Sequence, residues 1–129
     1  MGREIINQSK FYSQLTITSL CEKDGHKEIG KKFSGITLDD SVDNLISKSD
    51  VIIDFTSPSA TIQLIREIDK SKKKPALVTG TTGYSSKEEK NFNLLAKGKT
   101  ILRSFNMSIG VGLLKNLVSY SSEKVGNLD

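Results

Sequence analysis

The sequence predicts an α/β fold with a doubly wound parallel sheet. Two short apolar runs, Val51–Phe55 and Ala76–Thr79, each end in a turn of small residues. Between these runs Ile62, Ile65 and Ile68 recur at helical spacing. A strand, a helix and a strand form a right-handed βαβ unit, and ligands of such sheets bind where the strands end. We therefore look for function in the turns that follow the strands.

The elements before this unit are less regular. Residues 1–10 predict a helix with Ile5 and Ile6 on its apolar side, and no strand precedes it. The alternating, β-branched run Leu15–Leu20 predicts a strand that ends in a polar turn. Three further segments follow in order: a charged surface loop over 26–35, a short extended piece at 36–38 and a brief helix over 39–47.

The elements after the unit continue the alternation. Ser85 and Glu88 form a capping-box pattern, which opens a helix that stops near Gly98. Residues 100–103 predict a further strand with its exit turn at 104–108, and a long helix then runs to about Val125. Strands that alternate with helices indicate a parallel sheet with helices on both faces.

Composition narrows the classes of function. The 129 residues suit one domain, and 19 basic against 15 acidic residues give a net charge of +4. The one tight cluster, Lys72–Lys74, has no interleaved aromatic residues, so we expect no nucleic-acid partner. Cys21 and His26 are the only soft ligands, which predicts no metal site. No signal peptide and no apolar run near the roughly 20 residues of a membrane span are visible, so we expect a cytoplasmic protein without a membrane partner.

An acidic residue follows the second predicted element. Glu22 lies just past the strand that comes after the first helix, where an acidic residue of a dinucleotide-binding fold accepts hydrogen bonds from ribose hydroxyls. Lys23 beside it could meet a 2′-phosphate, so both NAD and NADP stay open. The alternative is a solvated, charged turn.

The strongest candidate is the turn Gly80-Thr81-Thr82-Gly83. Its glycines allow close approach of a flat ligand, and its threonines offer hydroxyls and amides. An ordinary connection from a strand to a capped helix explains the turn equally well. Phe55, Thr56 and Asn106 follow other strands at the same edge of the sheet. Phe55 is either a stacking surface or core, and Asn106 either holds a carboxamide or orders a loop.

Groups for catalysis are missing from these patterns. The sequence has no G-x-G-x-x-G loop and no Ser/His/acid or Cys/His set with usable spacing. The residues alone therefore predict a binding platform without a catalytic group.

Three segments resemble one known family. DVIIDFTSPSAT at 50–61, VTGTTGY at 78–84 and NMSIGVGLL at 106–114 are similar, in order and spacing, to cofactor-domain segments of dihydrodipicolinate reductase. The resemblance implies a Rossmann-like fold. It also implies reduction of a cyclic dihydrodipicolinate precursor by NADH or NADPH, on the diaminopimelate route to lysine, in a homotetramer.

The resemblance also implies roles for individual residues. Glu22 would hold the adenosine ribose, with Lys23 where the family often has Arg. Gly80, Thr81 and Thr82 would lie against the nicotinamide, with Phe55 and Thr56 flanking the cofactor. The next strand exit would line the same site with Ser104, Phe105, Asn106 and Met107. No residue of the chain is assigned a catalytic role.

The sequence departs from the family pattern at three places. Met1-Gly2-Arg3 resembles the last residues of the family's Gly-rich phosphate loop, and no strand precedes it. The family's His-His-x-x-x-Lys segment is not found, and Ser104-Phe105 replaces a small residue followed by Pro or Ala. We therefore expect residues 1–129 to be an incomplete dinucleotide-binding domain that lacks its first strand, its Gly-rich loop and the substrate and tetramerisation domain.

Two consequences and two alternatives follow from these departures. Strands beside a missing central strand would either expose unpaired edges and apolar faces or close up on each other. The chain alone would bind NAD(P)H poorly and catalyse nothing. One alternative is a non-catalytic nucleotide-binding module or a subunit that complements another chain. The other is a different oxidoreductase of the same fold, acting on aspartate-like substrates.

Overall fold

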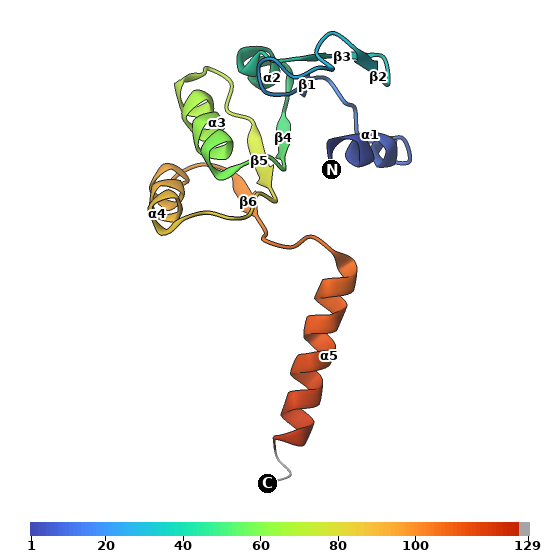
Figure 1. Ribbon diagram of the computed structural model, residues 1–129, viewed down its shortest axis with the longest axis vertical. Helices are drawn as coiled ribbons and strands as arrows, with labels where there is room; N and C mark the ends of the chain where they lie inside the picture. The colour runs from blue at the N-terminus through green and yellow to red at the C-terminus, as the bar shows by residue number, and fades with distance from the viewer. Residues whose placement is uncertain (127–129) are drawn as a thin grey trace.

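The structure is a computed structural model that describes residues 1–126, and within that range it holds two three-stranded sheets and five helices (Figure 1). The elements are α1 (Gly2–Ser9), β1 (Leu20–Cys21), β2 (Lys32–Phe33), β3 (Ile36–Asp39), α2 (Val42–Lys48), β4 (Val51–Asp54), α3 (Pro58–Lys70), β5 (Ala76–Thr79), α4 (Ser86–Leu95), β6 (Ile101–Arg103) and α5 (Ile109–Val125). The α/β class with parallel strands is confirmed. Among residues 1–126, no helix is long and apolar enough to span a membrane.

The sheet β4-β5-β6 is parallel, and it carries the core. Its register sets Ile52 beside Leu77, and Leu77 beside Ile101. The helices α3 and α4 lie on one side of this sheet (Figure 1). They bury the apolar side chains of that side against their own, because residues alternate between the two faces of a strand. The buried core cluster consists of Ile46, Ile52, Ile65, Ile68, Leu77 and Phe92.

Each helix of this unit begins at a serine cap. Ser57 precedes Pro58 at the start of α3 and accepts a hydrogen bond from the amide of Ala60 at 3.4 Å. Ser85 and Glu88 form the predicted capping box at the start of α4, with both reciprocal hydrogen bonds present. These caps satisfy amides that a helix leaves unpaired in its first turn, so they fix where α3 and α4 begin after the turns that leave β4 and β5.

The opposite face of the same sheet is exposed. Val51, Ile53 and Leu102 are 53%, 49% and 63% exposed, although the alternation of elements predicts helices on both faces. β4 pairs with β5 alone, and β1 pairs with β3 alone, so both are edge strands within residues 1–126. The predicted exposure of strand edges is confirmed at these two strands.

The sheet β1-β3-β2 corrects two predictions. The strand over Leu15–Leu20 is wrong in extent, because only Leu20 and Cys21 pair, with Leu38 and Asp39 of β3. The loop over 26–35 contains β2, which pairs with β3 in an antiparallel hairpin. Its two-residue turn is Ser34-Gly35, and both residues have positive φ, 51° and 82°, as tight hairpin turns require.

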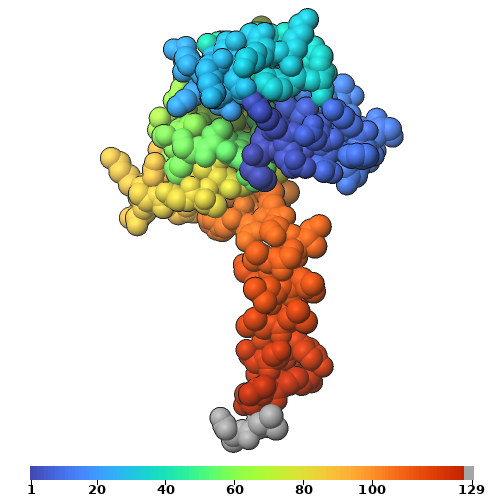
Figure 2. Space-filling view, turned by 45° about the vertical axis from the view of Figure 1, so that its right-hand side comes forward, coloured from blue at the N-terminus to red at the C-terminus, as the bar shows by residue number. Residues whose placement is uncertain are grey.

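The helix α5 projects from the rest of the chain as an isolated column (Figure 2). None of its residues, Ile109–Val125, is buried. Its apolar residues Leu113, Leu114, Leu117 and Val118 are all more than half exposed. The predicted helix is confirmed, and its position follows from the connection at 104–108 rather than from packing.

Candidate functional site

The exit segments of three parallel strands meet at one edge of the sheet β4-β5-β6. Asp54 is in register with Thr79, and Thr79 with Arg103, so the residues that follow them leave the sheet side by side. This is the edge at which parallel sheets bind ligands. A cavity of about 400 Å³ lies there, which is within the range of small-molecule sites. It is lined by Met1, Phe55, Gly80, Ser104, Phe105, Asn106, Met107 and Ser108.

The cavity brings together six of the eleven residues that the sequence indicates. Phe55 comes from the exit of β4, Gly80 from the exit of β5, and the segment 104–107 from the exit of β6. Segments separated by more than twenty residues in the chain therefore contribute to one surface. The surface is mostly apolar and aromatic, with polar groups from Ser104 and Asn106.

Gly80 lies directly under the ring of Phe55. A Cβ atom at Gly80 would be 2.1 Å from Cε1 of Phe55, so only glycine leaves room for the ring in this position. From the sequence we expect Gly80 to allow the close approach of a ligand. In the structure the Phe55 ring occupies the space next to Gly80. The Phe55 ring is half-buried and forms a wall of the cavity, so the two readings of Phe55 as stacking surface and as packed residue are combined.

The carboxylate of Asp54, the last residue of β4, is hydrogen-bonded to the segments that leave both β4 and β5. Its carboxylate is 4% exposed and accepts hydrogen bonds from the amide of Thr56 at 3.1 Å and from the hydroxyls of Thr79 and Thr81 at 3.0 and 3.2 Å. The hydroxyls of Thr56 and Thr61 also donate to it, each at 2.5 Å. A buried carboxylate with this many donors fixes the turns on which the cavity is built.

Sequence reasoning assigned Asp54 no role. The signal was present, because Asp54 lies two residues after Ile52 and therefore on the same face of the strand, which is the buried one. The carboxylate is acceptor-only when ionised, so the surrounding hydroxyls all donate toward it. The role of Thr56 and Thr81 in the structure is thus to order the turns, and Thr81 is itself 2% exposed.

The exit of β6 is held by its own side chains. The amide of Ser108 donates to Oδ1 of Asn106 at 2.8 Å, and the hydroxyl of Ser104 donates to the carbonyl of Asn106 at 2.9 Å. The hydroxyl of Ser108 then accepts from the amide of Val111 at the start of α5. Asn106 orders the loop, and its side-chain NH₂ keeps two donors for a ligand.

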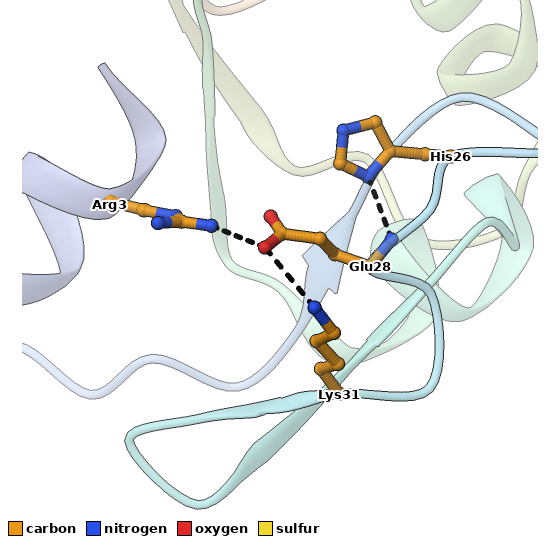
Figure 3. A network of polar contacts seen from close by, with 4 residues as sticks. All are labelled: Arg3, His26, Glu28 and Lys31. Carbon is orange, nitrogen blue, oxygen red and sulfur yellow. Dashed lines mark hydrogen bonds and ion pairs between the residues drawn. The ribbon is translucent and has the colours of Figure 1, made fainter.

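Met1 reaches the cavity because α1 is anchored to the loop before β2. In Figure 3 the carboxylate of Glu28 accepts a hydrogen bond from Arg3 and pairs with Lys31 at 3.6 Å, and His26 Nδ1 accepts from the amide of Glu28 at 3.3 Å. The hydrogen bond from Arg3 holds the pKa of Glu28 below its ordinary value. His26 therefore shapes a turn, and it does not line the cavity.

Five of the eleven predicted residues lie outside the cavity lining: Thr56 and Thr81, which order the turns, and Glu22, Lys23 and Thr82. Glu22 and Lys23 follow β1 in the other sheet, where the amide of Glu22 donates to the carbonyl of Asp39 at 2.9 Å and both side chains are exposed. Thr82 is exposed in the turn after β5.

Burial, with a smaller contribution from nearby Asp39, raises the pKa of the Cys21 thiol to about 11, so this thiol is protonated near neutral pH.

The side chains that line the cavity are suited to contacting a ligand and offer little for proton transfer. The side chains of the lining residues carry two aromatic rings, two thioethers, two hydroxyls and an amide, and none of these side chains is titratable. Among residues 1–126 no group of three or more His, Cys, Asp or Glu is placed to hold a metal ion. Such a surface suits a flat, largely apolar ring with a polar substituent.

Comparison with known proteins agrees with this geometry. Residues 1–107 match the family described as dihydrodipicolinate reductase, N-terminus. The 4-hydroxy-tetrahydrodipicolinate reductase of Pelagibacter ubique is 39% identical over 125 residues, which cover 97% of this chain and 46% of that protein.

Two further relatives carry the same name. The protein of a Nitratiruptor species is 42% identical over 95 residues, covering 74% of this chain and 37% of its own length. The protein of Roseobacter denitrificans is 32% identical over 125 residues, covering 91% and 45%. The chain thus spans less than half the length of each of these three relatives. The match over 1–107 establishes that the chain belongs to the dihydrodipicolinate reductase family, as a counterpart of its N-terminal region.

Proposed function

We propose that the chain forms the cofactor-binding part of a 4-hydroxy-tetrahydrodipicolinate reductase that uses NADH or NADPH. The observation that carries this proposal is the cavity at the exits of β4, β5 and β6, with two aromatic walls from Phe55 and Phe105. The names of the relatives supply the reaction. When bound, the nicotinamide ring would supply a hydride to a small cyclic substrate on the route to diaminopimelate and lysine.

The residues of the chain would bind and orient the cofactor. Gly80 and the exposed Thr82 would lie along the nicotinamide side, with Phe55 beside them. The hydroxyls of Thr56 and Thr81 bond within the protein, so these two residues would flank the cofactor through the turns that they order. Ser104, Phe105 and Met107 would close the site from β6, and the free NH₂ group of Asn106 would donate to the carboxamide. The side chains of the lining are uncharged, and those of Phe55 and Phe105 would shield one face of a ring placed there from water.

Glu22 and Lys23 would serve the other end of the dinucleotide. A carboxylate after β1 would accept hydrogen bonds from the adenosine ribose, and the ammonium of Lys23 would tolerate a 2′-phosphate. In this proposal residues 1–129 are an incomplete dinucleotide-binding domain. The complete enzyme would be a cytoplasmic homotetramer that takes its proton donor and substrate-binding groups from a further domain.

Nuclear magnetic resonance tests the proposal and also detects weak binding. We would titrate the ¹⁵N-labelled chain with NADH, with NADPH and with AMP. We expect both dinucleotides, but not AMP, to shift the amides of Gly80, Thr81 and Asn106. The variant Asn106→Ala should weaken this response, whereas Asn116→Ala on the exposed surface of α5 should leave it unchanged. Shifts confined to other regions, or no shifts with either dinucleotide, would contradict the assignment.

A complementing subunit is the second candidate, and the edge of β4 favours it. β4 pairs on one side only, and its outward side chains Val51 and Ile53 are about half exposed. An edge of this kind accepts an added strand from a partner chain. Size-exclusion chromatography with light scattering distinguishes the candidates, since a stable monomer with a cooperative thermal transition would argue against the need for a partner.

A further inference from the structure

Arg103 ends β6 and lies with its guanidinium inside the molecule. Its side chain is 11% exposed, and both terminal nitrogens donate to the carboxylate of Glu89 on α4, each at 2.8 Å. A planar guanidinium and a carboxylate joined by two parallel hydrogen bonds have one defined relative orientation. Glu89 therefore fixes the plane of the Arg103 guanidinium.

Three aromatic rings surround this guanidinium. The ring centroids of Tyr84, Phe92 and Phe105 lie 4.1, 4.3 and 4.5 Å from its central carbon. Tyr84 and Phe92 also contact each other edge to face, with centroids 5.7 Å apart. These distances are well within the range of cation–π contacts.

The three rings differ in what else holds them. Phe92 is buried in the core and Tyr84 is packed against it, whereas Phe105 is 65% exposed at the cavity. The Phe105 backbone belongs to the exit segment of β6, whose side-chain hydrogen bonds are local. The amide of Ser104 donates to the carbonyl of Thr79 at 3.1 Å, which holds the start of this segment to the sheet but does not contact the Phe105 ring. Arg103 is thus the connection between the ring of Phe105 and the packed core.

We propose that Arg103 is a positioning residue that fixes the ring of Phe105 as a wall of the cofactor cavity, with Glu89 holding Arg103 in place. The identity of the ligand rests on the proposed function, but the position of the ring does not. A lysine could not replace Arg103, because a compact ammonium offers neither a flat surface for three rings nor two parallel donors for Glu89.

The first test follows the Phe105 ring itself. We would record the aromatic ¹H–¹³C spectrum of the chain and assign the Phe105 signals with the variant Phe105→Leu. We expect Arg103→Lys to move the Phe105 ring signals and to remove their nuclear Overhauser contacts to the side chain at 103. Glu89→Gln should shift them in the same direction by less, while Arg66→Lys, on the exposed surface of α3, should leave them in place. Unchanged Phe105 signals in a folded Arg103→Lys variant would overturn the proposal.

The second test couples the two residues through a ligand. Reduced nicotinamide mononucleotide would be titrated into the wild type, Arg103→Lys, Phe105→Leu and the double variant. Each single variant should weaken binding about fivefold, the size of one cation–π contact, and the double variant should be no weaker than Phe105→Leu alone. Losses that multiply would show that Arg103 acts through other groups and would overturn the positioning role. If the wild type does not bind this probe, the proposed function fails, and the ring signals still decide whether Arg103 positions Phe105.

Discussion

The unit β4-α3-β5-α4-β6 and the helix α5 show what packing adds to local sequence signals. Both regions contain helices that begin at serine caps, at Ser57, Ser85 and Ser108. In the unit the apolar stripe of α3 is buried against the parallel sheet, whereas every residue from Ile109 to Val125 of α5 stays accessible. The caps specify where each helix begins, and burial alone specifies where it lies.

The candidate site lies at the boundary of these two regions. Phe55 and Gly80 belong to the packed unit, while Ser104 to Ser108 form the connection to α5. Two side chains link this boundary to the packed unit. Asp54 is hydrogen-bonded to the exit segments of β4 and β5, and Arg103 contacts the ring of Phe105 after β6. The comparison therefore predicts that substitutions have large effects in the unit, specific effects at the boundary and small effects in α5.

Truncating one side chain in each region gives the largest expected difference. Ile65 is fully buried in α3, so Ile65→Ala should lower the free energy of unfolding by about 2–5 kcal/mol. Leu117→Ala in α5 should change it by less than about 0.5 kcal/mol, because Leu117 is 54% exposed. Urea denaturation followed by circular dichroism measures both values. Equal losses would show that α5 is packed in solution.

Removing the carboxylate of Asp54 should have the next largest effect. Asp54→Ala leaves the buried hydroxyl of Thr79 without its acceptor and removes the shorter of two hydrogen bonds available to Thr61, whose other acceptor is Oγ1 of Thr81 at 3.1 Å. We expect a cost of about 3 kcal/mol. Asp54→Asn keeps an acceptor oxygen and should lose less. The same denaturation experiment compares the two variants, and a smaller loss for alanine than for asparagine would exclude the hydrogen-bonded cluster as the source of stability.

The same substitution should have opposite signs at two glycines. Gly80→Ala places a Cβ against the Phe55 ring, and the displaced ring should cost about 1–3 kcal/mol. Gly112→Ala in α5 meets nothing within 4 Å and should stabilise the helix by about 0.5–1 kcal/mol. Thermal melts report both effects. Destabilisation at Gly112 would place α5 against another surface.

Lowering the pH should reduce the stability of the protein by protonating Glu89 at the boundary, and we expect this change in stability to be the smallest of the four. Hydrogen bonds from Arg103 hold the pKa of Glu89 below its ordinary value. The contribution of Glu89 to stability is therefore fully present above the unfolded pKa of about 4.3, and it is lost as the pH falls through the lower pKa of the folded state. Melting temperatures between pH 7 and pH 3 should fall less steeply for Glu89→Gln than for the wild type, and parallel curves would exclude this linkage.

The sequence was sufficient for the packed unit because its signals are local and consistent. Three kinds of signal each indicate one element: the short apolar runs of β4 and β5, the isoleucines at helical spacing in α3, and the capping box of Ser85 and Glu88. The hairpin β2-β3 was missed because a charged segment surrounds it, although Ser34-Gly35 is a tight-turn signal. Leu15–Ser19 has strand-forming residues but no pairing partner within residues 1–126, so propensity alone gave the wrong extent.

The segments that form the candidate site could be predicted from the sequence, but the buried side chains that hold these segments in place could not. Parallel strand exits converge by topology, so the meeting of Phe55, Gly80 and Asn106 could be expected from the order of the elements. The roles of Asp54 and Arg103 depend on contacts across twenty or more residues of chain or between a strand and a neighbouring helix. Periodicity and propensity carry no information on such contacts.

Hydrogen exchange of individual amides tests most directly whether the candidate site rests on the packed unit. The amide of Thr56 donates to Asp54 and to Thr81, and the amide of Leu77 pairs within the sheet. We predict that Thr56 exchanges nearly as slowly as Leu77 in β5, and that amides in the middle of α5, such as that of Leu117, exchange at least about a hundredfold faster because local opening is cheap there. Thr56 exchanging as fast as Leu117, or Leu117 as slowly as Leu77, would contradict the account.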